Sequence, residues 1–163
     1  MDSGIPIDII FLDFKKAFDT VPHERLMIKL KAHRVDGNIL RWIRSWLKSR
    51  RQRVVLNGEF SDWSDVVSGV PQGSVLGPVL FTVFINDIDQ GVVNLIKKFA
   101  DDTKLIGKVK FEHDIESIWI DLRSLEEWSE KWQLKFNGDK CKVMHISLLK
   151  INMLNMLLMQ KKK

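Results

Sequence analysis

Cysteine is nearly absent from this chain, which has only Cys141 among its 163 residues. A single thiol excludes an internal disulfide and any zinc site built from several cysteines. Long apolar stretches are missing too, since none approaches the roughly 20 residues that a membrane-spanning helix needs. Asp8 and Asp13 interrupt the one apolar run near the start, which argues against a secretory signal. We therefore expect an intracellular protein without a membrane partner, in either the nucleus or the cytoplasm.

Internal repeats and low-complexity linkers are also lacking, so we expect one principal domain. Hydrophobic residues make up 45% of the chain, which is enough for a core. The net charge of +5 favours an anionic partner, although an ordinary basic protein has the same balance. We place the domain at residues 1–147. We treat residues 148–163 as a divergent tail, because their pattern fits neither a helix nor a strand period; a short amphipathic helix is the alternative.

Apolar periodicity and turn signals predict a fixed order of elements. Residues 7–12 form an Ile-rich run typical of a buried strand, and Asn57-Gly58 is a strong hairpin signal. The expected elements are a strand at 7–12, a helix capped by Asp19 or Thr20 and ending near 33, a helix after Asp36, strands at 53–57 and 60–66, a glycine-rich loop at 68–77, a helix at 78–88, strands at 94–100 and 103–109, a helix at 112–134 and a strand at 142–147. This order predicts an α+β fold in which helices pack on one face of an antiparallel sheet.

Two of these helices are expected to be amphipathic. The buried face of the helix after Asp36 is expected to contain Ile39, Trp42, Ile43, Trp46 and Leu47. The helix at 112–134 has an apolar stripe and an acidic outer face that includes Asp121. We expect the six tryptophans in the core. The histidines lack the spacing of metal ligands, so we assign structural roles to His23, His33, His113 and His145.

Acidic residues end two of the predicted strands. Asp13 follows the strand at 7–12, and Asp101 and Asp102 form the tip of the hairpin at 94–109. If these strands lie side by side, the carboxylates repel one another unless a cation sits between them. Such a cluster suits Mg²⁺, which takes oxygen ligands and keeps part of its shell for water and phosphates. Ordinary turn residues are the alternative.

Three segments carry a family resemblance: FLDFKKAFDTVPH at 11–23, SGVPQGSVLGPVLF at 68–81 and FADDTK at 99–104. Their order, spacing and residue identities resemble those of the palm of a reverse transcriptase from a retrotransposon without long terminal repeats. The resemblance runs from about Ile7 to about Ile146 and implies a polymerase palm-like fold with part of the fingers. It implies RNA-directed DNA synthesis, with an RNA template, a DNA primer and a deoxynucleoside triphosphate (dNTP) as partners. The implied cofactor is two Mg²⁺ ions, for which Mn²⁺ is a substitute.

The resemblance also assigns roles at the acidic end. Asp13 and Asp101 are implied metal ligands, with Asp102 as the adjoining supportive carboxylate. The backbone carbonyl of Phe14 is implied as a further ligand. Lys140 matches a lysine thought to protonate the leaving pyrophosphate, and a solvated lysine is the alternative.

Nucleotide contacts are implied in two places. Phe18 matches an aromatic residue that packs under the incoming sugar and excludes the ribose 2′-hydroxyl by clash; a core residue is the alternative. Gln72 and Gly73 match the nucleotide-contact loop, where glutamine offers a donor and an acceptor. Without the family, this segment is only a Gly-Pro turn. Lys15 and Lys16 are expected to meet the triphosphate.

A basic set follows the second helix. Its members are Arg41, Arg44, Lys48, Arg50, Arg51 and Arg53. They are expected to follow a nucleic-acid backbone, and a solvated face is the alternative.

A second hypothesis for the whole chain is a catalytically inactive relic of a mobile element, acting as a nucleic-acid-binding or interaction module. Similar enzymes have a fingers region before the first strand and a thumb after the last, whereas only residues 1–6 precede the strand here. We therefore expect weak or no polymerisation by the chain alone, with the flanking segments supplied in trans.

Overall fold

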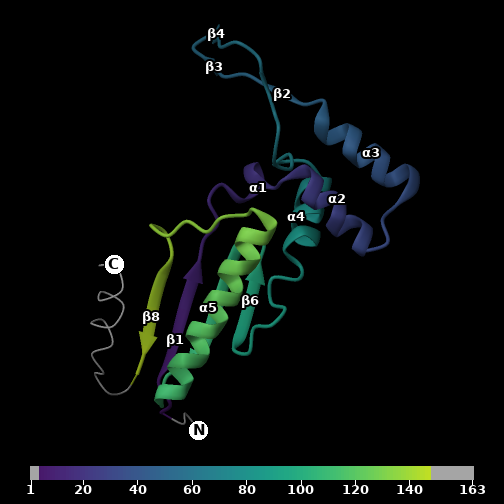
Figure 1. The fold of residues 1–163 in the computed structure, drawn as a ribbon. Coiled ribbons are helices and arrows are strands. Elements are labelled where there is room, and N and C mark those ends of the chain that lie inside the picture. Colours follow the sequence, from purple (N-terminus) through teal and green to yellow (C-terminus); the bar gives the residue numbers. More distant parts are fainter. Residues whose placement is uncertain (1–3, 148–163) are drawn as a thin grey trace.

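A four-stranded antiparallel sheet forms the centre of the protein (Figure 1). A computed structural model describes residues 4–147; the expected tail at 148–163 lies outside the described residues. The strand order is β6-β7-β1-β8, with bounds β1 Ile7–Leu12, β6 Leu95–Phe99, β7 Asp102–Lys108 and β8 Lys142–Ile146. The first strand in the chain is therefore an inner strand, with antiparallel neighbours on both edges.

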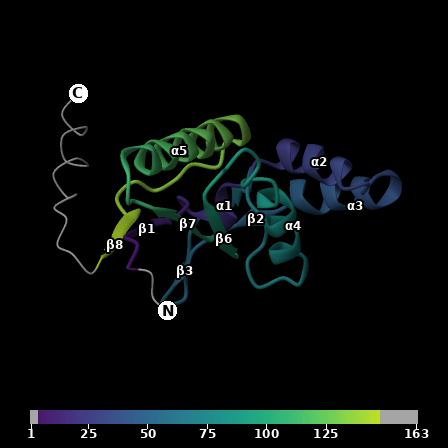
Figure 2. The same cartoon turned by 90° about the horizontal axis from the view of Figure 1, so that it is seen from below.

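Helix α5 (Glu112–Trp132) covers one face of this sheet (Figure 2). Side chains alternate between the two faces of a strand. In β1 the residues Asp8, Ile10 and Leu12 are buried, while the intervening residues are only half-buried. The buried set marks the face beneath α5.

The other helices gather near the end of the sheet at which β1 terminates (Figure 1). They are α1 (Ala17–Thr20), α2 (His23–Ala32), α3 (Gly37–Lys48) and α4 (Leu76–Ile85). Helix α2 contacts both α3 and α4. The predicted α+β class is confirmed. No helix within residues 4–147 has the length and apolar character that a bilayer crossing requires.

A thin hairpin arm, residues 50–66, projects away from the helices and the sheet (Figure 1). It contains β2 (Arg51–Gln52), β3 (Val55–Leu56), β4 (Glu59–Phe60) and β5 (Ser64–Asp65). The predicted Asn57-Gly58 turn joins β3 to β4, and both residues have positive φ, at 50° and 85°. The strands are shorter than predicted, because their exposed residues have no second layer to pack against in the described chain.

The first predicted helix is split in two. Val21 is extended (φ −57°, ψ 116°), as expected for a residue that precedes proline. The predicted cap at Asp19 or Thr20 is therefore wrong, because both residues lie inside α1 and Pro22 is the N-cap of α2. The Thr20 hydroxyl instead donates to the carbonyls of Lys15 and Lys16.

The predicted buried face of α3 is only partly correct. Ile43 and Leu47 are buried, but Ile39 is 65% exposed and Trp42 is 58% exposed. The apolar arc of this helix is wider than the surface that covers it in the described chain. Trp63 on the arm is also exposed, so the expectation of six core tryptophans is wrong for Trp42 and Trp63.

Asp121 is the clearest departure on α5. It was expected on the acidic outer face, yet it is 0% exposed. Its carboxylate accepts hydrogen bonds from the backbone N–H groups of Val93 and Asn94, and from the Asn94 side chain, each at 2.8 Å. The residue anchors the segment entering β6 to the helix. The sequence prediction put Asp121 on the outer face because the residue is charged. In the fold, three hydrogen-bond donors hold its carboxylate in a buried position.

Replacing Asp121 with alanine should destabilise the fold strongly. Two backbone N–H groups would lose their buried acceptor, at a cost of about 2–4 kcal/mol. Urea unfolding followed by circular dichroism measures the change. Glu126→Ala, on the exposed side of the same helix, is the control and should shift stability by less than about 0.5 kcal/mol. Equal midpoints for the two variants would contradict the anchoring role.

Candidate functional site

The acidic residues meet at one end of the sheet. Leu12 of β1 pairs with Thr103 of β7, so the next positions outward are Asp13 and Asp102. Asp102 also pairs with Phe99 across the β6–β7 turn, and Asp101 stands in that turn. Because Leu12 and Thr103 face the buried side, strand alternation directs Asp13 and Asp102 to the open face.

Lys140 lies beside Asp13. Its Nζ is 3.7 Å from the Asp13 carboxylate oxygen Oδ2. The turn that carries Lys140 is tied to the end of β1, since the Asn137 N–H donates to the Asp13 carbonyl at 2.7 Å. Phe14 stacks on Phe136 with ring centroids 4.7 Å apart, which fixes the same junction. The structure therefore brings together the lysine and the aspartate that the sequence separates widely.

The donor set suits a hard cation that is shared with a ligand. Within residues 4–147 no group of three or more Asp, Glu, His or Cys side chains is arranged to hold a metal ion by itself. The Asp13 side chain is 39% exposed and Asp101 lies on an open turn, so both carboxylates remain accessible. Mg²⁺ binds few protein carboxylates and fills its shell with water and phosphate oxygens. The residues present fit such a site and do not fit a closed protein cage.

The loop at 68–74 docks on α1. The Gly69 N–H donates to the Val21 carbonyl at 2.8 Å, and the Val70 N–H donates to the Phe18 carbonyl at 2.7 Å. Gly69 has φ +84°, and a Cβ built there would lie 2.6 Å from the Asp19 carbonyl oxygen. Only glycine allows this approach without displacement.

Phe18 faces the core with part of its ring. It stacks on the fully buried Phe81, with centroids 4.5 Å apart, but stays half-buried itself.

Lys16 and Gln72 line one pocket of about 610 Å³, which also includes Asp19. Among the other residues assigned to the nucleotide, Gly73 is in the turn just beyond Gln72, and Lys15 is exposed with its N–H bonded to the Lys135 carbonyl.

The predicted basic set does not form one continuous free surface. Arg44 and Lys48 both pair with Glu24 of α2, and Arg51 pairs with Asp65. The hydrogen bond from Lys48 is the main cause of a lowered Glu24 pKa. Arg41 contacts Asn38, Arg50 bonds to backbone carbonyls, and Arg53 stacks on Phe60 and Trp63 at 4.2 and 4.6 Å. Exposed ion pairs are weak, so phosphates can still compete for several of these groups.

A second polar cluster escaped sequence analysis. Lys29 is buried and pairs with Asp87, while its ammonium lies 3.6 Å from the centroid of the Trp132 ring. Burial lowers the Lys29 pKa, and Asp87 opposes that change. Trp128 donates its indole N–H to the same carboxylate at 2.9 Å. Nothing in the sequence indicated this pair, because Lys29 on α2 and Asp87 in the turn after α4 are far apart in the chain.

The sheet and its covering helix form a palm-like α+β fold. Two telomerase structures from Candida tropicalis share the fold. The apo form, truncated from its C-terminal domain, has a TM-score of 0.63 at 16% identity and covers 91% of this chain and 32% of that chain. The form in complex with a fragment of telomeric RNA has a TM-score of 0.64 at 14% identity, covering 86% and 26%.

The chain belongs to the reverse transcriptase family. The family model for reverse transcriptase (RNA-dependent DNA polymerase) matches residues 8–162. A probable RNA-directed DNA polymerase from transposon X-element of Drosophila melanogaster is 34% identical over 85% of this chain. The RNA-directed DNA polymerase from mobile element jockey of the same species is 35% identical over 80%. The chain spans only 16% and 15% of these two relatives.

Gly69→Ala should disturb the docked loop. The new methyl group meets the Asp19 carbonyl, so we expect a loss of about 2–3 kcal/mol, more than the backbone conformation alone costs. Gly91→Ala is the matched control, because Gly91 has φ +85° with open space around it, and about 1 kcal/mol is expected there. Urea unfolding compares the two variants. A loss at Gly69 no larger than that at Gly91 would contradict the close approach.

Proposed function

We propose that this chain is the palm of an RNA-directed DNA polymerase, which joins a dNTP to the 3′-hydroxyl of a primer on an RNA template. The β1–β7 register carries the proposal, because it sets Asp13 beside the turn that holds Asp101 and Asp102. Family membership supports it, as do relatives named as RNA-directed DNA polymerases.

Asp13 and Asp101 would hold two divalent ions, Mg²⁺ or its substitute Mn²⁺, with Asp102 and the Phe14 carbonyl as further ligands. When bound, such ions stabilise the attacking and leaving oxygens of a phosphoryl transfer. The primer 3′-hydroxyl would lose its proton to water, its oxygen would form a bond to the α-phosphorus, and the bond from that phosphorus to the pyrophosphate oxygen would break. Lys140 would give a proton to the departing pyrophosphate, and the 3.7 Å between its Nζ and Asp13 supports this role.

The dNTP would lie in the pocket lined by α1, the base of the arm and the loop at 68–74. Stacking on Phe81 holds the Phe18 ring in place, and a ring that cannot move aside excludes a 2′-hydroxyl by clash. Gln72 and Lys16 line the adjoining pocket, where an amide and an ammonium suit a base or template contact and a triphosphate. Lys15 and Gly73 flank these two positions.

An inactive module is the second candidate function, and the exposed arm favours it. Leu56 is 68% exposed, Phe60 59% and Trp63 51%, so the arm offers apolar and aromatic surface that the stacking of Arg53 covers only in part. In this case the chain binds nucleic acid or protein without catalysis. The two candidates differ in whether fingers and thumb segments supplied in trans enable catalysis.

Primer extension on an RNA template with Mg²⁺ tests the polymerase proposal. We expect weak extension by the chain alone, because it spans only 16% and 15% of the two polymerases it resembles. Asp101→Ala should abolish even that signal, while Asp62→Ala, at an exposed position on the arm, should leave it unchanged. Extension that survives Asp101→Ala would contradict the metal assignment.

Metal binding offers a readout that needs no activity. Paramagnetic Mn²⁺ should broaden the amide resonances of Asp13 and Asp101 in the native chain, and this broadening should be lost in Asp101→Ala. Uniform broadening over the surface would instead indicate diffuse attraction.

Salt dependence tests the basic set. If Arg53 contacts a phosphate, Arg53→Ala should weaken primer–template binding and reduce the slope of log K against log salt by about one. Lys31→Ala, an exposed cation on α2 outside the set, is the control. A nearly flat salt dependence of the native chain would contradict backbone tracking by the arm and α3.

A further inference from the structure

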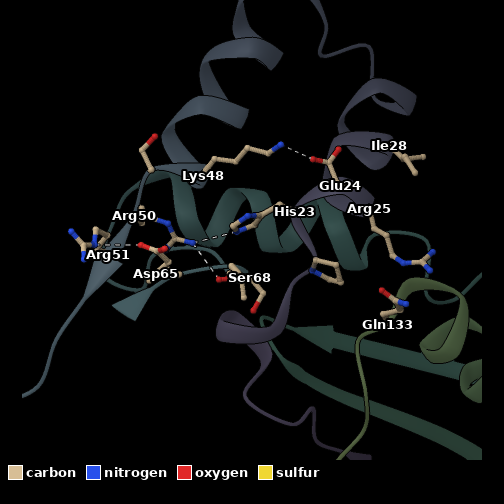
Figure 3. A pocket seen from close by; sticks show the side chains of 14 residues that line it. His23, Glu24, Arg25, Ile28, Lys48, Arg50, Arg51, Asp65, Ser68 and Gln133 are labelled. Carbon is tan, nitrogen blue, oxygen red and sulfur yellow. Dashed lines mark hydrogen bonds and ion pairs between the residues drawn. The ribbon is translucent and has the colours of Figure 1, made fainter. Parts of the chain in front are cut away.

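Two side chains from separate elements converge on the carbonyl of Gly69. Figure 3 shows these two side chains, His23 and Arg50, close to each other and to Ser68. His23 Nε2 lies 2.9 Å from this oxygen, and the Arg50 guanidinium donates to it at 2.5 Å. The same guanidinium also reaches the Ser68 carbonyl at 3.4 Å. A carbonyl oxygen has two lone pairs and accepts both donors at once. We call this arrangement, made by His23, Arg50 and the Gly69 carbonyl, the Gly69 latch.

The latch joins parts of the molecule that the chain separates. His23 begins α2, while Arg50 follows α3 and donates through Nε to the Leu47 carbonyl at 3.3 Å. Arg50 is also the base of the arm, since its carbonyl accepts the Val66 N–H at 2.9 Å. Gly69 opens the loop that docks on α1. One carbonyl therefore connects α2, the end of α3, the arm and the loop.

The surroundings of His23 favour its neutral form. The Gly69 oxygen only accepts, so Nε2 carries a proton, and burial together with the nearby Arg50 charge disfavours a second proton on the ring. Burial lowers the pKa of His23 from 6.5, the hydrogen bond to Gly69 opposes this, and nearby Arg50 lowers it further. Charged groups that face the ring are Arg50 and Lys48 from the end of α3 and Glu24 from its own helix, while Arg25, Arg51 and Asp65 line the same pocket of about 930 Å³.

We propose that His23 and Arg50 are positioning residues for the loop at 68–74, which they hold against α1 in the conformation that receives the nucleotide. This inference rests on the proposed function and deepens it. It also changes the role expected for Arg50, whose guanidinium is engaged with two loop carbonyls instead of a nucleic-acid phosphate.

Residue-resolved amide hydrogen exchange tests the latch in the full chain. The Gly69 and Val70 N–H groups bond to α1 and its flank, so their protection reports loop docking. His23→Ala and Arg50→Ala should each lower that protection about tenfold, as expected for one lost buried hydrogen bond. His23→Gln keeps a donor and should restore most of it. Arg25→Ala removes a cation from the same pocket without touching Gly69, and should change nothing.

Lowering the pH supplies a second test, because a residue with a purely structural role would not make the protection of the loop depend on pH. Because the folded-state pKa of His23 lies below 6.5, the unfolded chain binds the proton first as pH falls. The contribution of neutral His23 is therefore present above 6.5 and lost as pH drops through its folded pKa. Protection factors of Gly69 and Val70, corrected for intrinsic exchange, should fall in that window in the native chain but not in His23→Gln.

Nucleotide binding completes the test. Calorimetry with dTTP and Mg²⁺ should show a Kd at least about threefold higher in Arg50→Ala than in Arg25→Ala, because a looser loop binds less tightly. Protection in His23→Ala or Arg50→Ala equal to that in Arg25→Ala would overturn the latch. A loosened loop with unchanged dTTP affinity would overturn the positioning role. Absence of dTTP binding by the native chain would count against the proposed function, while exchange still decides the latch.

Discussion

Strand β1 is hydrogen-bonded on both edges, and that double pairing decides where the acidic end of the molecule lies. Ile10 pairs with Leu105 on one side and with Val143 on the other. A shift of one residue in either ladder would turn every β1 side chain to the opposite face. Asp13 would then point toward the layer beneath α5 instead of the open face. The apolar residues of β1 fix the register of the strand. They therefore also fix the position of the Asp13 carboxylate, which is not part of the core.

The second constraint is the docking of the loop at 68–74 on α1. Backbone hydrogen bonds from Gly69 and Val70 hold the loop against α1 and its flank. Because Gly69 has no Cβ, the loop can approach the Asp19 carbonyl closely. Phe18 belongs to the same contact, because its carbonyl accepts the Val70 N–H while its ring stacks on Phe81. Phe18, the proposed sugar contact, and the loop at 68–74 are thus parts of one packed unit.

Local signals in the sequence were sufficient for much of this architecture. Three features depend only on neighbouring residues and are found as predicted: the Ile-rich run of β1, the Asn57-Gly58 turn and the long helical periodicity of α5. The sequence misled where a distant partner decides the outcome. Asp121 is buried because Val93 and Asn94 donate to it, and Trp42 is exposed because no described element covers it.

The candidate site shows the same division. Family motifs indicated Asp13 and Asp101, and strand pairing made their meeting expected. His23 ends the first family motif, but the resemblance assigned it no role, and its partner Arg50 was grouped with the basic set. Only the fold shows that both side chains reach one carbonyl. A neutral-to-charged hydrogen bond at a buried carbonyl contributes about 1.5–3 kcal/mol, whereas an exposed ion pair contributes about 0–1 kcal/mol. By that comparison Arg50 stabilises the loop more than Arg44 or Arg51 stabilise their surroundings. Because Arg50 is also the base of the arm, a displacement of the arm would be transmitted to the loop at 68–74 through this residue.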